Sequence, residues 1–252
     1  MPATVGLQLY TVRQLIAKSS FAAVVKEVAK IGYPGVELAG FPGTTAADAG
    51  KLLRDLGLKV TSGHFALPLG DQKQQVLDEV AAVGAKRIVS GRGPDDFKTL
   101  DLIKKSCDLF NQAGDVAAQN GLTLGIHNHW WEFQKVDGRL VFDVMREQLR
   151  PGIFFEIDVY WAKTAGADPA VEVKKAGARA PLLHIKDGPC QQGQPMTAVG
   201  AGKVDFPAIA KVSAGTADWW IVELDDCATD MMEAVRQSYR YITTNGFAKG
   251  KK

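Results

Sequence analysis

Four ionisable side chains follow apolar segments of this chain in a pattern that suits metal binding. His127 follows LTLGI, Asp158 follows FFEI, His184 follows PLL and Glu223 follows WWIV. Burying such groups together is costly unless they are paired or hold a cation. Mixed carboxylate and imidazole ligands suit Mn²⁺, Fe²⁺, Co²⁺ or Zn²⁺, whereas Mg²⁺ prefers oxygen ligands. The four residues predict a divalent metal site, for Mn²⁺, Co²⁺, Zn²⁺ or Mg²⁺.

Eight short β-like segments alternate with helical ones along the chain, and four of them carry these residues. The predicted strands are 5–10, 35–38, 58–65, 87–91, 122–129, 153–161, 181–187 and 219–224. No linker or composition shift divides the 252 residues, a length that matches the roughly 250 of an eight-fold barrel. We therefore expect one α/β domain, residues 1–252, with the (β/α)8 TIM barrel fold. The alternative, a doubly wound open sheet, lacks the Gly-x-Gly-x-x-Gly turn of dinucleotide-binding proteins.

The helical segments carry an apolar stripe on one side. Between residues 21 and 29 apolar side chains recur at i, i+3, i+4, i+7 and i+8, which is the period of an amphipathic helix. Ser19 or Ser20 can cap the start of this helix, and Gly32 can end it.

Alternation along each strand assigns its side chains to the barrel interior or to the helices. Ile153, Phe155 and Ile157 form one apolar face, which turns Glu156 and Asp158 inward. The same test on the other strands gives the inward polar residues Gln8, Tyr10, Glu37, His64, His127, His129, His184, Lys186 and Glu223. These residues gather at strand C-termini, the end of a barrel where active sites lie.

Composition excludes several classes of partner. A net charge of +2 is too small for a nucleic-acid-binding surface, and no apolar run is long enough for a membrane span. Cys107, Cys190 and Cys227 are too few and too scattered for a disulfide framework. The N-terminal residues lack the pattern of an export signal. We expect a cytoplasmic protein that binds neither nucleic acid nor membrane, and a homo-oligomer stays open.

Four motifs carry a resemblance to a known family. They are LGIHNHWWEF (124–133), FEIDVYWAKTAG (155–166), LLHIKDG (182–188) and WIVELDD (220–226). The chain resembles the xylose-isomerase-like TIM barrels, the sugar phosphate isomerase/epimerase superfamily, nearly from end to end.

The resemblance implies one divalent metal held by a Glu, an Asp, a His and a Glu at the ends of strands five to eight. Asp158, His184 and Glu223 match the last three positions. The first position departs, because His127 stands where many members have a Glu. Besides His127, both His129 and Glu132 are candidates for the first ligand.

The chemistry implied by the resemblance is proton transfer next to the carbonyl of a small carbohydrate, so the chain is expected to be a metal-dependent sugar isomerase or epimerase. Glu223 would be both ligand and base, with Glu132, Glu156 or His129 facing it across the substrate. Lys186 either pairs with developing negative charge or neutralises Glu156. The residues expected to contact the substrate are His64, His129, Trp161, Glu37 and Tyr10.

Other functions use the same residues. A keto-sugar or inosose dehydratase or lyase would start from the same proton transfer. A DNA-repair endonuclease-like phosphodiesterase would need more histidines than the four present, and a non-catalytic sugar-binding protein is the non-enzyme alternative. The Gly-rich stretch 188–206 is expected to be a loop above the site, either a lid or an ordinary surface loop.

Overall fold

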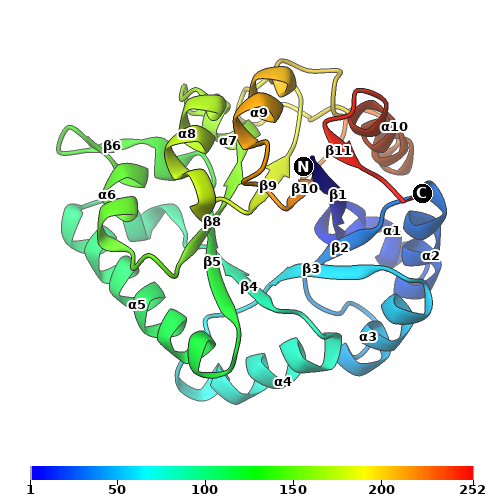
Figure 1. The fold of residues 1–252 in the computed structure, drawn as a ribbon, viewed down its shortest axis with the longest axis horizontal. Helices are drawn as coiled ribbons and strands as arrows, with labels where there is room; N and C mark the ends of the chain where they lie inside the picture. The colour runs from blue at the N-terminus through cyan, green and yellow to red at the C-terminus, as the bar shows by residue number, and fades with distance from the viewer. Residues whose placement is uncertain (1, 252) are drawn as a thin grey trace.

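The computed structural model describes residues 2–251 and shows a ring of parallel strands surrounded by helices (Figure 1). In this part of the chain the barrel strands are β1 (Ala3–Gln8), β2 (Gly35–Leu38), β3 (Lys59–His64), β4 (Arg87–Ser90), β5 (Thr123–His127), β8 (Phe154–Asp158), β9 (Leu182–Ile185) and β10 (Trp219–Val222). They pair in chain order, and β10 closes the ring against β1 with Val5 opposite Trp220. The fold is thus a closed eight-stranded (β/α)8 TIM barrel in a single domain, as the sequence predicted.

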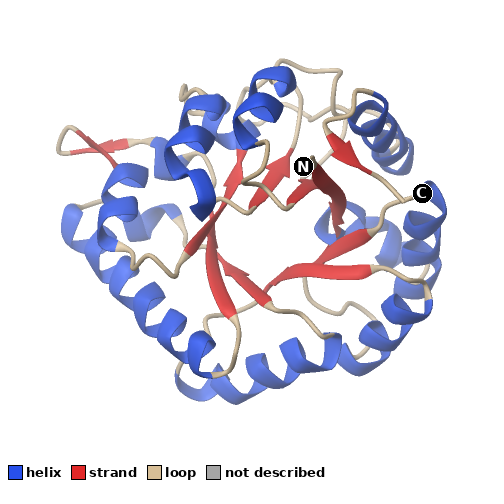
Figure 2. Cartoon of the chain, in the orientation of Figure 1, coloured by secondary structure: helices blue, strands red, loops and turns tan. Residues whose placement is uncertain are grey.

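The helices form the outer layer, and Figure 2 shows them as a shell around the strands. They are α1 (Arg13–Lys18), α2 (Phe21–Ile31), α3 (Ala46–Asp55), α4 (Lys73–Val83), α5 (Leu100–Gln119), α6 (Val141–Gln148), α7 (Val159–Thr164), α8 (Pro169–Ala176), α9 (Phe206–Ser213) and α10 (Met231–Thr244). None of the helices within residues 2–251 is both long and apolar enough to cross a membrane.

The barrel also carries short elements that the sequence did not predict. Single 3-10 turns are η1 (Leu9–Val12), η2 (Gly70–Gln72), η3 (Pro94–Phe97), η4 (Trp131–Phe133) and η5 (Gly177–Arg179). The strands β6 (Lys135–Val136) and β7 (Arg139–Leu140) form a hairpin that projects from the barrel, and β11 (Ala248–Lys249) pairs with β1.

The ends of α2 follow from the sequence as expected. Ser20 caps its start, accepting a hydrogen bond from the backbone N–H of Ala23, and Gly32 ends it at a φ of 112°. That left-handed conformation favours glycine, which has no Cβ.

Several strands end earlier than predicted, and the polar side chains are the physical reason. β1 stops at Gln8, whose side chain accepts a hydrogen bond from the N–H of Tyr10 and starts η1. β8 stops at Asp158, which caps α7 through the N–H of Trp161. Tyr10 and Trp161 therefore lie in helical turns rather than in the strands where the sequence analysis placed them, and His129 lies beyond the end of β5.

The barrel interior has an apolar layer beneath the polar one. Val89, Phe154, Leu182 and Ile221 form a separate buried cluster. Phe154, Leu182 and Ile221 each precede a polar inward residue by two positions, so they share its side of the strand. This cluster fills the centre of the barrel and supports the ionisable residues at the C-terminal rim.

The stretch between β9 and α9 is a structured loop. The buried carboxylate of Asp187 accepts hydrogen bonds from the backbone N–H groups of Gly188, Gly200, Gly202 and Val204. The loop is therefore tied to the end of β9 through one side chain, which favours the interpretation as an ordinary ordered loop over a lid.

The interior packing generates a first prediction. A Cβ at Gly125 on β5 would overlap the ring of Phe154. We expect Gly125→Ala to lower the free energy of unfolding by about 1–3 kcal/mol, because overpacking forces the ring and backbone to shift. Urea denaturation measures this. Gly152→Ala is the matched control, since its Cβ would meet nothing within 4 Å. Equal stability of the two variants would contradict this account of the interior.

Candidate active site

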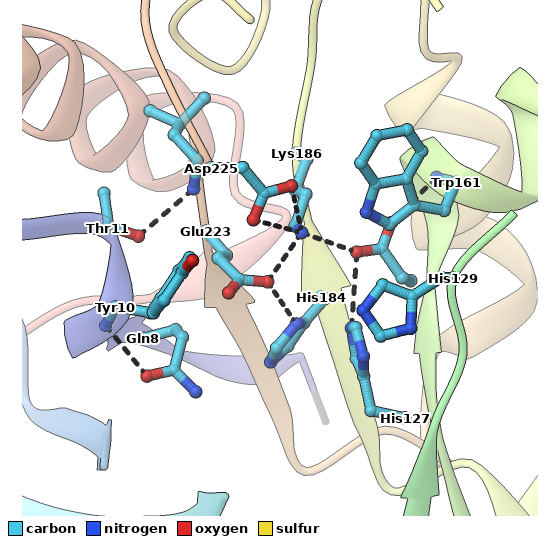
Figure 3. A network of polar contacts seen from close by, with 12 residues as sticks. Gln8, Tyr10, Thr11, His127, His129, Trp161, His184, Lys186, Glu223 and Asp225 are labelled. Atoms are coloured by element: carbon cyan, nitrogen blue, oxygen red, sulfur yellow. Dashed lines mark hydrogen bonds and ion pairs between the residues drawn. The ribbon is translucent and has the colours of Figure 1, made fainter. Parts of the chain in front are cut away.

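A pocket of about 440 Å³ lies over the C-terminal ends of the strands, within the size range of small-molecule sites. Figure 3 shows its central polar side chains. Its lining residues are Tyr10, Ala39, His64, Gly91, His127, His129, Lys186, Glu223 and Asp225. The segments that line it come from all around the barrel, so residues distant in sequence meet at one surface.

The structure brings together the four residues that the sequence predicted as metal ligands. One ligand atom from each of His127, Asp158, His184 and Glu223 lies within 4.8 Å of all the others. The Nε2 atom of His127 is 3.4 Å from Oδ2 of Asp158, and Nδ1 of His184 is 2.7 Å from Oε2 of Glu223. Two carboxylates and two imidazoles make a donor set that suits a divalent transition metal.

The facing atoms of this group support the fit. Within the described residues, four buried atoms make no well-aligned hydrogen bond: Nε2 of His127, Oδ2 of Asp158, Nδ1 of His184 and Oε2 of Glu223. Their closest contacts are ion pairs with one another and with Lys186. Buried polar atoms normally make well-aligned hydrogen bonds, and four that converge on one point without them suit a cation. The residues present therefore fit a bound divalent cation.

Local hydrogen bonds hold Asp158 in place. Its Oδ1 atom accepts from the N–H of Trp161 at 2.8 Å, and its backbone N–H donates to Oδ1 of Asn128 at 3.0 Å. Nδ2 of Asn128 donates to the backbone carbonyl of Asp158 at 3.3 Å. One carboxylate oxygen thus serves as a helix cap, while the other is left to face the site.

His184 is positioned by carboxylates on both sides of its ring. Nε2 lies 2.7 Å from Oε1 of Glu37, opposite the Nδ1 atom that faces Glu223. Glu37 is fully buried and also accepts hydrogen bonds from Gln8 and Ser62. A carboxylate behind a ligating histidine fixes the orientation of its ring.

A second acidic and imidazole group lies deeper in the barrel. Glu37, His64, Glu156 and His184 also offer atoms within 4.8 Å of one another. Most of their polar atoms contact one another: His64 lies 2.9 Å from Glu156 and 3.2 Å from Glu37, and of the buried atoms in this group only Oε1 of Glu156 and Nδ1 of His184 make no aligned hydrogen bond. Burial and the neighbouring Glu37 raise the pKa of Glu156 to about 8, so this carboxyl is largely protonated at neutral pH. This group is a hydrogen-bonded support for His184.

Lys186 is a buried cation beside the first group. Its Nζ atom lies 2.8 Å from Oε2 of Glu223, 3.1 Å from Oδ2 of Asp158 and 3.0 Å from Oδ2 of Asp225. Burial alone would lower its pKa, but these three carboxylates hold the pKa well above its usual range. Lys186 is a charged ammonium, and Glu156, the partner in one of its two expected roles, is not among these carboxylates.

The remaining titratable groups of the pocket have defined protonation states. Burial would raise the pKa of Glu223, but Lys186 and His184 hold it well below its usual range, so Glu223 is an ionised carboxylate. Burial and the cationic His184 lower the pKa of His127 well below its usual range. Burial and the adjacent His127 lower the pKa of His129 to about 2. Both of these imidazoles are neutral bases.

Two residues expected in catalysis lie away from the pocket surface. Glu132 is fully buried, and its Oε2 atom accepts a hydrogen bond from the N–H of His129 at 2.8 Å. It belongs to neither group of candidate ligands among the described residues. Glu156 lies in the deeper group and does not line the pocket. Their positions favour structural roles, in which Glu132 orients His129 and Glu156 holds His64.

The residues expected to contact substrate divide in the same way. Tyr10, His64 and His129 line the pocket, whereas Glu37 is sealed beneath it. The Nζ atom of Lys186 lies 5.5 Å from the ring centroid of Trp161, so the indole borders the charged centre.

Asp225 and Asn128 are site residues that the sequence analysis missed. Asp225 is two positions after Glu223 in WIVELDD, and that parity was the available signal. By strand alternation, Asn128 falls on the opposite side from its neighbours His127 and His129, so no signal in the sequence pointed to it. Its role is seen only in its two hydrogen bonds with the backbone of Asp158.

The family model for the xylose isomerase-like TIM barrel matches residues 25–244. The chain belongs to this family. Comparison with curated proteins yields no match.

Solved structures extend this finding. A sugar phosphate isomerase/epimerase from Parabacteroides distasonis is 27% identical, with 98% of this chain and 100% of that chain covered and a TM-score of 0.85. A second protein of that description from the same organism is 25% identical, with 99% and 96% covered and a TM-score of 0.83. The IOLI protein with a bound zinc atom is 15% identical, with 97% and 98% covered and a TM-score of 0.73, a likeness that shows the fold alone.

The burial of Glu132 generates a pH-dependent prediction. Burial raises its pKa from 4.5 to about 8, so the folded state holds this proton more tightly than the unfolded state. The ionisation of Glu132 therefore lowers the free energy of unfolding as the pH rises from about 4.5 to 8. We expect Glu132→Gln to remove that fall, because an amide keeps the hydrogen bond to His129 without ionising.

Urea denaturation between pH 5 and pH 8 measures this difference, with Glu79→Gln, a half-buried helix substitution, as control. Turnover of the variant should stay within about threefold of wild type. A loss of tenfold or more in turnover, with an unchanged pH dependence of stability, would instead give Glu132 a role in the chemistry.

Proposed function

We propose that this protein is a divalent-metal-dependent isomerase or epimerase that acts on an unphosphorylated keto-sugar by proton transfer next to its carbonyl. The observation that carries the proposal is the convergence at the pocket of four buried ligand atoms, from His127, Asp158, His184 and Glu223, that make no well-aligned hydrogen bond. These four residues would hold the metal. Bound there, a divalent cation would act as a Lewis acid on sugar oxygens.

Glu223 is the proposed base. Its Oε2 atom belongs to the metal group, which leaves the second carboxylate oxygen for a proton from the substrate carbon. The carboxylate is ionised because Lys186 and His184 hold its pKa low. An ionised carboxylate within the pocket can accept that proton without first losing its own.

His129 and Lys186 are proposed to complete the chemistry. In Figure 3, His129 lies on the opposite side of His184 from Glu223, so the two can address opposite faces of a bound sugar. Because its pKa is lowered to about 2, His129 is a neutral imidazole, which can hydrogen-bond to a sugar hydroxyl on that face and orient it. The ammonium of Lys186 lines the pocket and can stabilise negative charge that develops on a sugar oxygen.

Charge in the pocket supports a substrate without phosphate. Its carboxylates, Glu223 and Asp225, would repel a phosphate group. Lys186 is already paired with Glu223 and His64 with Glu37, and no other lysine or arginine belongs to the described lining. Sugar hydroxyls, in contrast, can bond to these carboxylates and imidazoles as donors and acceptors.

A solvent-exchange experiment tests the function. Manganese-loaded protein is incubated in D₂O with keto-pentoses, keto-hexoses and inososes, and NMR follows deuterium at the carbon next to the carbonyl. Exchange with an epimeric or isomeric product is expected for a substrate. Loss of water to give an unsaturated ketone would assign the site to a dehydratase, and absence of exchange across these classes would contradict the proposal.

The Glu223→Gln variant tests the proposed base. We expect kcat to fall at least about 100-fold, while KM changes less, because the amide can occupy the same space but cannot accept the proton. Glu233→Gln, an exposed helix substitution, is the control. Retention of more than a tenth of wild-type turnover would remove Glu223 from the proton-transfer step.

A further inference from the structure

Lys186 is surrounded by more negative charge than a single ion pair requires. Its side chain is 1% exposed, and three carboxylates lie around Nζ, those of Asp158, Glu223 and Asp225. Burial of an ammonium is costly unless it is paired, so these contacts account for its presence beneath the pocket.

Two of the three carboxylates belong to the candidate metal group. The atoms that approach the ammonium are Oδ2 of Asp158 at 3.1 Å and Oε2 of Glu223 at 2.8 Å. These are two of the oxygens that a cation would use, and their contacts with the ammonium are ion pairs rather than aligned hydrogen bonds. An ammonium and a divalent cation therefore compete for the same two oxygens.

The third carboxylate holds Lys186 from outside the metal group. Nζ donates to Oδ1 and Oδ2 of Asp225 at 3.2 and 3.0 Å, and these contacts are aligned hydrogen bonds. Arg13 donates to the backbone carbonyl of Asp225 at 2.7 Å, which fixes this residue from the neighbouring loop. Figure 3 shows the ammonium between Asp225 and Glu223.

We propose that Lys186 is a built-in counter-cation of the metal site: it neutralises Asp158 and Glu223 when no metal is bound, and Asp225 retains it when a divalent cation takes those oxygens. This inference rests on the proposed metal site. With the metal bound, the ammonium stays beside the pocket, where it can pair with a substrate oxygen.

Thermodynamic linkage gives the inference a definite sign. Contacts made only in the metal-free protein oppose metal binding by the free energy that they contribute. Removing the ammonium should therefore tighten metal binding and destabilise the metal-free protein more than the loaded one. Removing the charge of Asp225 should weaken metal binding, because Lys186 then has no carboxylate partner when the metal occupies the oxygens of Asp158 and Glu223.

Calorimetric titration with Mn²⁺ tests this on wild type, Lys186→Met, Asp225→Asn and the double variant, with the exposed Lys104→Met as control. We expect Lys186→Met to bind Mn²⁺ at least tenfold more tightly and Asp225→Asn at least threefold more weakly. The double variant should match Lys186→Met within twofold, because Asp225 acts through the lysine. The control should stay within twofold of wild type.

Thermal unfolding supplies a second readout. For Lys186→Met the melting temperature should fall more without Mn²⁺ than with saturating Mn²⁺, and Lys186→Gln repeats the test should the Met variant fail to fold. Unchanged or weaker Mn²⁺ binding by these variants would overturn the counter-cation role while leaving the metal site intact. Failure of wild type itself to bind Mn²⁺, Co²⁺ or Zn²⁺ would overturn the metal site, and with it this inference.

Discussion

Burial of carboxyl groups at the rim of the barrel is the constraint on which the rest of this structure depends. Asp158 and Glu223 are nearly inaccessible to water, and a carboxylate in such surroundings needs a cation or several donors nearby. His184 on the adjacent strand β9 and Lys186, the residue that follows this strand, supply positive charge. Parallel pairing of neighbouring strands sets these partners at the same height, as the register of Asp158 opposite His184 shows.

The same constraint extends outward through layers of support. Glu37 holds the far side of His184, and Gln8 and Ser62 hold Glu37 in turn. Asn128 fixes the backbone of Asp158. A hydrogen-bonded network of this kind determines which atoms remain free to face the pocket, so reactivity at the surface is set by residues that no substrate touches.

Much of this arrangement follows from sequence because strand parity is a local property. Alternation alone turned Asp158, His184 and Glu223 toward one interior, and barrel closure then required them to meet. The sequence did not reveal where side-chain hydrogen bonds to the backbone would compete with the hydrogen bonds of the sheet. Gln8 and Asp158 cap the helical turns that follow them, and these caps end the strands earlier than predicted. The position of Glu132 behind His129 depends on the three-dimensional structure. So do the three carboxylate partners of Lys186, which are Asp158, Glu223 and Asp225.

The position of a bound metal tests the account most directly. Crystals of the manganese-loaded protein, measured at the manganese absorption edge, would locate the ion by anomalous scattering. The account predicts one strong peak among His127, Asp158, His184 and Glu223, with Lys186 in contact with Asp225. A peak among Glu37, His64 and Glu156 instead, or no peak at this rim under saturating Mn²⁺, would contradict it.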